Sequence, residues 1–397
     1  MIKDFNYCAP TRVVFGRQSE EKIPDLIRQY GGTKVLIHYG GGSAVRSGLI
    51  GKIHDLLDDA GIPYVELGGV VPNPLLSMVY KGIELCREEG VDFILAVGGG
   101  SVIDSSKAIG YGINYDGDVW DFWDGKAKPE SAVPVGAVLT IPAAGSEMSD
   151  SCVITKDDGL IKRGFNSDLC RCKFAVMNPE RTFTLPPYQT AAGCTDIMMH
   201  TMERYFSKYQ DMTLTDNLAE ALLRTVKECT YQVLAHPDDY RARAQIMWAG
   251  SLSHNNLMEC GSEKDFATHR LEHELSAKFN VTHGAGLAAL WPSWARYVMG
   301  DKQNVPRFAR FAVNVMGIEN DFTDIDGTAE RGVQAMERFY HDIGMPTTIK
   351  ELLDRTITDD EIADMVDKAS RHGTMTLGSI MTIHPADMTA IYQLANH

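Results

Sequence analysis

The chain has 397 residues, of which 44% are hydrophobic and 23% are charged, an ordinary composition for a soluble globular protein. This length exceeds what one hydrophobic core usually supports, so we expect two domains. The formal net charge of −15 argues against non-specific binding to nucleic acid or to an anionic membrane. A membrane span is not expected either, because no run of about 18 apolar residues occurs.

Cysteine usage and the start of the chain predict a cytoplasmic protein. The eight cysteines are scattered and form no Cys-x-x-Cys pair, which favours reduced thiols over a disulfide framework. Residues 1–8 lack the basic segment and apolar core of a secretory signal.

Strands and helices alternate in the first half of the chain. The predicted strands cover residues 34–39, 63–67, 92–97, 135–141, 152–155 and 173–177. Helical spacing of apolar residues predicts helices over 49–57, 75–90 and 102–112. This alternation predicts βαβ units and a parallel, Rossmann-like sheet that is buried on both faces. Residues 116–124, which include Trp120 and Trp123, are predicted to form a loop.

The pattern changes near Thr184-Leu-Pro-Pro187. Beyond this point amphipathic helical runs replace the strands, and Thr358-Asp-Asp-Glu361 is a capping box that predicts a helix start. We therefore expect a dinucleotide-binding α/β domain over residues 1–184 and an all-helical, metal-binding domain over residues 185–397.

Four potential metal ligands stand out in the second domain. Asp196 and His200 are four residues apart in a predicted helix, so both side chains leave the same face. His269 and His283 flank a second predicted helix that runs into a turn at Gly284. Three imidazoles and one carboxylate suit Fe²⁺ or Zn²⁺ better than Mg²⁺ or Ca²⁺. If the four converge, they hold one divalent ion and leave a position for a substrate oxygen.

Two glycine runs follow predicted strands. Gly98-Gly-Gly-Ser101 lies where a strand turns into a helix, so its backbone can approach a diphosphate at the helix N-terminus. Gly40-Gly-Gly-Ser43 lies where nucleotide folds usually meet the adenosine ribose. It carries no carboxylate, and Arg46 follows about one turn later, which favours NADP(H) while leaving NAD(H) possible.

The chain resembles the iron-containing (group III) alcohol dehydrogenase family, and within it the butanol dehydrogenase-like branch. The resemblance covers essentially the whole chain. It rests on both glycine runs, the two ligand pairs, and several further segments, which are Pro10–Gly16, Val71–Pro74, Asp104 to Lys107, Gly145–Glu147 and His269–Ala277. It implies a dehydroquinate synthase-like architecture and hydride transfer between a nicotinamide and a small primary alcohol or aldehyde.

The resemblance also implies roles for individual residues. The metal ligands are the four residues identified above, and His273 matches a histidine proposed as a proton relay. The implied cofactor-binding residues are Gly41, Ser43, Asn73, Gly98, Gly99, Gly100, Ser101, Asp104, Thr140 and Lys162. Two departures stand out. Ala144 replaces a threonine of many relatives, and the stretch Cys260–Asp265 is idiosyncratic.

Other functions stay open from the sequence. Related architectures include polyol dehydrogenases and a cyclising lyase, dehydroquinate synthase. The lyase would need several basic residues, whereas Met148–Ser151 and Asn255–Met258 are neutral to acidic and partly apolar. A non-catalytic nucleotide or metal sensor is a further alternative. We expect a homodimer with a small-molecule substrate and no nucleic-acid or membrane partner.

Overall fold

The computed structural model describes residues 2–397 and divides the chain between Thr184 and Leu185. An α/β unit comprises Cys8–Thr184, and a helical unit comprises Leu185–His397 together with residues 2–7. The sequence placed these first residues with the α/β domain. They belong with the helical unit because the Lys3 N–H donates to the Gly261 carbonyl (3.1 Å) and Lys3 Nζ pairs with Glu263 (3.1 Å).

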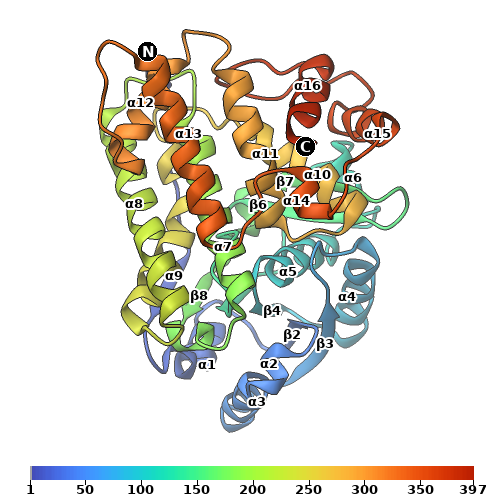
Figure 1. The fold of residues 1–397 in the computed structure, drawn as a ribbon. Helices are drawn as coiled ribbons and strands as arrows, with labels where there is room; N and C mark the ends of the chain where they lie inside the picture. Colours follow the sequence, from blue (N-terminus) through green and yellow to red (C-terminus); the bar gives the residue numbers. More distant parts are fainter. Residues whose placement is uncertain (1) are drawn as a thin grey trace. The chain divides into compact units, whose positions relative to one another are not determined.

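A parallel sheet forms the centre of the α/β unit (Figure 1). Within residues 2–397 it has six strands in the order β1-β8-β5-β4-β2-β3. Their bounds are β1 Arg12–Phe15, β2 Val35–Gly40, β3 Tyr64–Val70, β4 Phe93–Gly98, β5 Val135–Leu139 and β8 Phe174–Met177. Every residue of β4, β5 and β8 is buried, which explains their continuous apolar sequences. The predicted Rossmann-like sheet is confirmed.

The helices of this unit and an antiparallel hairpin complete its fold. The hairpin pairs β6 (Ser151–Lys156) with β7 (Ile161–Asn166). The helices are α1 Ile23–Gln29, α2 Ser43–Arg46, α3 Leu49–Asp59, α4 Leu76–Glu89, α5 Gly100–Gly112 and α6 Asp121–Asp124. The sequence did not predict β1, β7 or α1. Strand β1 has four residues and β7 carries Lys162 and Arg163, so neither gives a sustained apolar pattern.

The tryptophan segment is not simply the loop that the sequence predicted. Asp121–Asp124 forms one helical turn, α6, and the rings of Trp120 and Trp123 stack with centroids 5.9 Å apart and an interplanar angle of 7°. Both side chains are buried. Burial of the two indoles orders a segment whose other residues are mostly polar.

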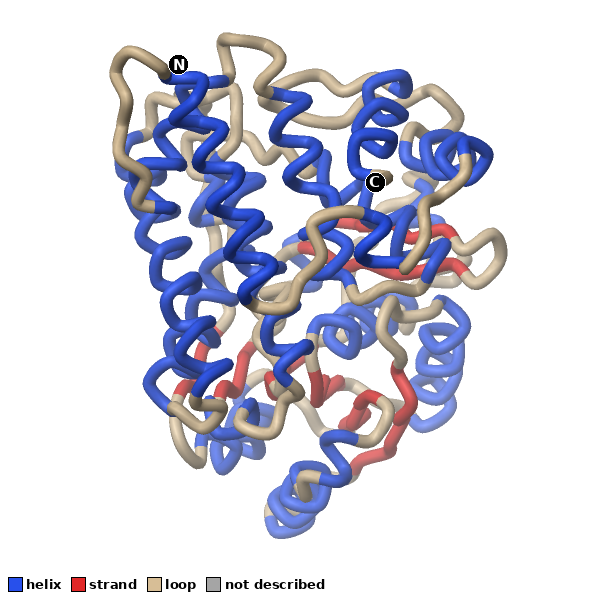
Figure 2. The backbone as a smooth tube through the Cα atoms, in the orientation of Figure 1, coloured by secondary structure: helices blue, strands red, loops and turns tan. Residues whose placement is uncertain are grey.

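The helical unit contains helices and connecting loops, with no strand among its described residues (Figure 2). The helices are α7 Pro187–Tyr205, α8 Thr213–Ala235, α9 Tyr240–His254, α10 Ala267–Phe279, α11 His283–Val298, α12 Val305–Phe311, the π-helix η5 Ala312–Met316, α13 Ile325–Asp342, α14 Ile349–Leu353, α15 Asp359–Ala369 and α16 Pro385–Ala395. The predicted capping box is confirmed at the start of α15. Across residues 2–397, none of the helices has the length and apolarity needed to cross a membrane.

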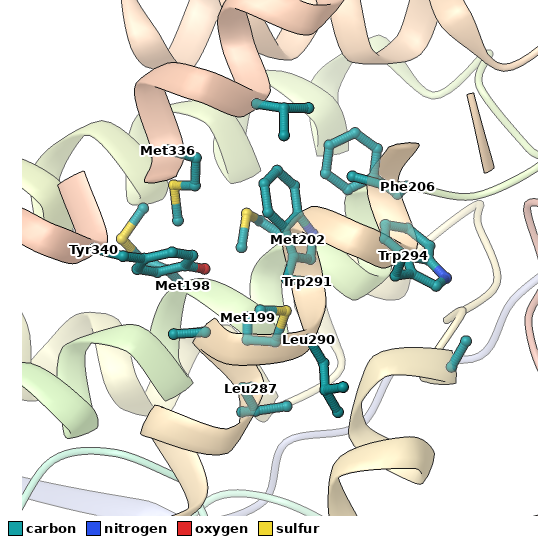
Figure 3. Packing of buried hydrophobic residues seen from close by; sticks show 14 of the residues in the cluster. Met198, Met199, Met202, Phe206, Leu287, Leu290, Trp291, Trp294, Met336 and Tyr340 are labelled. Atoms are coloured by element: carbon teal, nitrogen blue, oxygen red, sulfur yellow. The ribbon is translucent and has the colours of Figure 1, made fainter. Parts of the chain in front are cut away.

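Helix α7 runs through the core of this unit. All of its residues from Thr190 to Tyr205 are buried. Figure 3 shows Met198 and Met202 of α7 close to Trp291 of α11 and Tyr340 of α13, within one apolar cluster. A helix buried all round gives its polar side chains no access to bulk water. The polar residues of α7 therefore require partners inside the unit.

A buried histidine links the sheet to α5. His38 of β2 is fully buried, its Nδ1–H donates to the Leu67 carbonyl (2.7 Å), and the Ser105 hydroxyl donates to its Nε2 (2.9 Å). The carbonyl can only accept, so these partners fix the neutral tautomer. Burial lowers the pKa of His38 from 6.5 to about 4, although the bond to Leu67 opposes this shift.

We expect His38 to make the protein sensitive to mild acid. A depressed pKa means that the neutral ring stabilises the fold above pH 6.5, and that this contribution is lost as the pH falls towards 4. The loss is at most about 1.4 kcal/mol per pH unit. His38→Gln retains a donor and an acceptor without titrating. Urea midpoints at pH 7 and pH 5 should therefore differ less in the variant than in the wild type, and equal differences would contradict this role.

Candidate metal and nucleotide sites

The first two predicted metal ligands lie together in the core helix. Asp196 and His200 project from the same face of α7, and Asp196 Oδ1 lies 3.2 Å from His200 Nδ1. Their side chains are only 5% and 4% exposed. The four-residue spacing therefore produces the adjacency that the sequence predicted.

The other two predicted ligands approach the same carboxylate oxygen. His269 Nε2 of α10 lies 3.6 Å from Asp196 Oδ1, and His283 Nε2 of α11 lies 3.7 Å from it. Gly284 does not form the turn that the sequence predicted, because α11 begins at His283. A Cβ on Gly284 would stand 2.0 Å from the Ala192 carbonyl oxygen. Only glycine permits α11 to approach α7 so closely beside His283.

The cluster is incomplete without a further group. Asp196 Oδ1, His200 Nδ1 and His269 Nε2 are buried and have no hydrogen-bond partner among the described residues. The ligand atoms of these three residues all lie within 4.8 Å of one another. Leaving buried polar atoms unsatisfied costs roughly 1–3 kcal/mol each. A divalent ion would satisfy all of them, so the residues present fit a metal.

The electrostatics of the cluster favour a positive charge at its centre. Burial raises the pKa of Asp196, but the neighbouring His200, His283 and His269 rings outweigh this effect and hold that pKa well below its usual value. Burial lowers the pKa of His200. Burial also opposes protonation of His269, yet Glu203 and Asp196 prevail and raise its pKa to about 9. Coordination requires the neutral ring, so binding of an ion at His269 competes with protonation.

Two glutamates that the sequence did not single out orient these histidines. Glu203 accepts hydrogen bonds from His269 Nδ1–H and from the His269 backbone N–H. Glu272 accepts one from His283 Nδ1–H. Each carboxylate thereby directs the opposite nitrogen, Nε2, towards Asp196. Spacing could have revealed Glu203, which follows Asp196 by about two helical turns and so shares its face.

Further aromatic rings surround the cluster. The rings of His254 and His200 are 4.0 Å apart, and Phe266 stacks on His269 at 4.8 Å. Phe266 has a φ of 54°, a conformation that non-glycine residues rarely adopt. It directly follows the idiosyncratic stretch Cys260–Asp265, which thus leads to the ligand helix. The proposed relay, His273, is buried, with its ring 6.4 Å from His269 and 5.8 Å from His283.

The second glycine run forms a tight cradle in the α/β unit. Gly98 ends β4, Gly99 is the N-cap of α5, and Gly100 and Ser101 form the first turn of that helix. A Cβ on Gly99 would stand 2.3 Å from Ile141 Cγ2, and one on Gly100 would stand 2.8 Å from the Cβ of Ala144. The loop after β5 therefore packs directly against the glycines. The first N–H groups of α5 have no acceptor within the helix, which suits a diphosphate.

Most of the other predicted cofactor residues lie at the same edge of the sheet. Gly41 and Ser43 follow β2, Asn73 follows β3, and Thr140 follows β5 and donates its N–H to the Gly98 carbonyl (3.1 Å). These strands are parallel, so their carboxyl ends share one edge. The chain leaves β2 towards β3 on one side and β4 towards β5 on the other. Ligands of open α/β sheets bind at such a switch point.

The two remaining predicted cofactor residues, Asp104 and Lys162, are buried and do not directly follow a strand of the parallel sheet. Asp104 is buried, and its carboxylate accepts hydrogen bonds from the Ser146 hydroxyl (2.5 Å) and the Val153 N–H (2.9 Å). The neighbouring Lys107 Nζ donates to the carbonyls of Ser146, Ser149 and Ser151 at 2.7–3.1 Å. Both side chains thus fasten the segment that leads into β6. Lys162 is buried on β7 opposite Thr155, whose N–H donates to the carbonyl of Pro74 (2.8 Å), the residue after Asn73.

Both units match one protein family. Residues 10–179 match the iron-containing alcohol dehydrogenases, and residues 190–396 match the C-terminal part of the Fe-containing alcohol dehydrogenase family. The chain belongs to the iron-containing alcohol dehydrogenase family. The family that the sequence predicted is confirmed, and so is its dehydroquinate synthase-like architecture.

Similar proteins extend over essentially the full length of the chain. NADH-dependent butanol dehydrogenase A of Clostridium acetobutylicum is 40% identical, with 98% of each chain covered. NADPH-dependent aldehyde reductase YqhD of Escherichia coli is 34% identical, covering 99% of this chain and 100% of its own. The crystal structure of NADH-dependent butanol dehydrogenase A from Thermotoga maritima has a TM-score of 0.94 at 36% identity, covering 100% of this chain and 99% of its own. The predicted enzyme class, an alcohol dehydrogenase or aldehyde reductase, is confirmed.

We expect the wild-type enzyme to bind one divalent ion per chain and Asp196→Ala to lose it. Removing the oxygen on which the three imidazoles converge should weaken the affinity for Zn²⁺ or Co²⁺ by more than about 100-fold, beyond the 10–100-fold typical of changes outside the ligand shell. Elemental analysis and chelator competition measure this. Asp342→Ala, at an exposed residue of the same unit, is the matched control. Equal affinities of Asp196→Ala and the wild type would exclude this site.

Proposed function

We propose that this enzyme interconverts small, uncharged primary alcohols and their aldehydes, with butanol and butyraldehyde as representative substrates. A nicotinamide cofactor and one divalent ion, Fe²⁺ or Zn²⁺, serve the reaction, in the cytoplasm. The observation that carries the proposal is the convergence of three histidines on Asp196 Oδ1, with buried ligand atoms lacking hydrogen-bond partners among the described residues.

The residues of the helical unit would hold the divalent ion in this mechanism. When bound, the ion supplies a Lewis acid that lowers the pKa of an alcohol and polarises an aldehyde carbonyl. Asp196, His200, His269 and His283 provide the ligand set, and Glu203 and Glu272 keep two of the imidazoles in the tautomer that can coordinate. No protein nucleophile is required, because a bound nicotinamide would accept or supply the hydride itself.

The residues of the α/β unit hold the cofactor. The N–H groups at the start of α5 bind the diphosphate beside Gly98 to Ser101. Gly41 and Ser43 lie beside the adenosine ribose, while Asn73 and Thr140 line the same edge. Arg46 favours NADP(H), since its Nη1 lies only 3.1 Å from the position of a Cβ on Gly42, over the glycine run. Asp104 beside the diphosphate loop and Lys162, which reaches towards the nucleotide, complete the cofactor-binding set in this proposal.

A proton must also leave the substrate oxygen, and His273 is the proposed relay. It is buried one helical turn after His269, and its ring lies within 6.4 Å of two ligand rings. An imidazole is the side chain whose charge changes most readily near neutral pH. These features support a relay, with bulk water as the final acceptor.

The proposed reaction predicts metal-dependent consumption of a reduced nicotinamide. We expect the purified enzyme to oxidise NADPH in the presence of butyraldehyde, to lose this activity after chelation, and to regain it with Zn²⁺ or Fe²⁺. NADH assayed in parallel should give a lower kcat/KM, because it lacks the phosphate that Arg46 would bind. A higher value with NADH would contradict the cofactor preference. Turnover of 1,3-propanediol or glycerol but not of butanol would instead favour a polyol dehydrogenase.

The relay predicts a selective defect in His273→Ala. The variant should keep its bound ion and its affinity for NADPH, while kcat falls by roughly 10²–10⁴-fold, the range typical of general acid–base groups. The pH profile of kcat between 6 and 9 should change shape as well. Unchanged turnover throughout this range would remove His273 from the proton path.

A further inference from the structure

Glu272 is a carboxylate of α10 that is buried against α11. It has no exposed surface. The Ser276 hydroxyl donates to its Oε1, and His283 Nδ1–H donates to its Oε2. Glu272 and Ser276 are one turn apart on α10, whereas His283 is the first residue of α11. The carboxylate therefore joins the two helices across the turn between them.

The facing helix leaves room for this carboxylate at one position. A Cβ on Gly286 would stand 2.8 Å from Glu272 Oε1 and 2.9 Å from Glu272 Cγ. Gly286 lies three residues after His283, so both face α10 from the same side of α11. The carboxylate of Glu272 is thus enclosed by its contacts with Ser276, Gly286 and the ring of His283, which together form its binding pocket.

The orientation of the His283 ring depends on Glu272 more than the orientation of either other histidine ring depends on a single neighbour. Its side chain is 26% exposed, compared with 4% for His200 and 3% for His269. Core packing restrains those two rings, and Glu203 also holds both the ring and the backbone of His269. The hydrogen bond to Glu272 is the restraint that keeps the half-buried ring of His283 with Nε2 towards Asp196.

We propose that Glu272 is a positioning residue that fixes the tautomer and rotation of His283 and so determines how tightly and how long the protein holds its divalent ion. This inference rests on the proposed metal centre. Without Glu272, the ring of His283 can rotate or present Nδ1 in place of Nε2. Because His283 is the most exposed of the histidine ligands, we expect the ion to dissociate faster. The 10–100-fold loss of affinity typical of such outer partners sets the expected size.

The neighbours of Glu272 offer a competing role, in which Glu272 is itself a metal ligand. Ligand atoms of Glu272, His273 and His283 lie within 4.8 Å of one another. If these three residues held an ion themselves, Glu272 would be a ligand, and the wild-type protein would bind two ions per chain. Stoichiometry therefore distinguishes positioning from direct coordination.

The test measures metal binding directly, independently of catalysis. Full-length Glu272→Ala, Glu272→Gln and Gly286→Ala are loaded with Co²⁺. Their affinity, dissociation rate into excess chelator and visible Co²⁺ spectrum are then compared with those of the wild type. We expect about 10–100-fold weaker binding and faster release in Glu272→Ala, with smaller effects in Glu272→Gln, which retains an acceptor. Gly286→Ala keeps the carboxylate but displaces it, so it should weaken binding in the same direction and alter the spectrum.

Controls separate this role from general stability. Glu220 is also buried in the helical unit, where it bonds Tyr205, Arg310 and Asn314. Glu220→Gln should reduce thermal stability while leaving Co²⁺ affinity and spectrum unchanged. Wild-type affinity and release rate in folded Glu272 and Gly286 variants would overturn the inference, as would two ions per wild-type chain. Failure of the wild type to bind any ion would instead overturn the metal centre itself, and the inference with it.

Discussion

The helical unit is organised around the burial of one carboxylate. Asp196 is buried on α7 and its Oδ1 has no hydrogen-bond partner among the described residues, and an ionised carboxylate in such surroundings is costly unless it is paired. Three imidazoles approach it, and two of them bring the further carboxylates Glu203 and Glu272. Three carboxylates and three imidazoles therefore gather in one buried cluster, a donor set that suits a divalent cation. The close contact of Gly284 with Ala192 and the turn between α10 and α11 bring His283 to this cluster.

The α/β unit solves a comparable problem with backbone groups. A diphosphate needs concentrated donors without side chains in its way, and the start of α5 provides them beside Gly98 to Gly100. Ile141 packs against Gly99 and Ala144 packs against Gly100, so a side chain at either glycine would collide with the loop after β5. The position of that packing loop depends on Asp104 and Lys107, whose buried charges are satisfied by Ser146, Ser149, Ser151 and Val153. The loop behind the cradle is thus held in place by the hydrogen bonds of two buried ionisable side chains.

Periodicity in the sequence predicted the parallel sheet, the helical second half and the pairing of Asp196 with His200, since these depend on local spacing. The sequence predicted that His283 joins the cluster but placed a turn at Gly284, where the structure has the start of α11. The packing of Gly284 on Ala192 is a long-range contact, so the local sequence gives no sign of it. Glu203 and Glu272 were missed for a related reason. A glutamate in an amphipathic helix usually faces water. The seven-residue spacing from Asp196 places Glu203 on the ligand face, but only the fold shows that Glu272 is buried against an imidazole. Strand β1 escaped prediction because none of its four residues is buried and Arg12 begins it, so it lacks the continuous apolar run of β8.

Family membership leaves the choice of nicotinamide to the chain's own residues, since similar proteins are named for NADH and for NADPH. The discriminating group is the 2′-phosphate, and Arg46 is the cation placed over the Gly40–Ser43 run. Arg46 is exposed, so water and salt screen its attraction for a phosphate, and exposed ion pairs contribute about 1 kcal/mol or less. Since 1.4 kcal/mol corresponds to a factor of ten, this residue alone supports a preference for NADPH below about tenfold. Exclusive use of either cofactor would require a buried carboxylate or a second cation at this edge, and the run from Gly40 to Ser43 supplies neither.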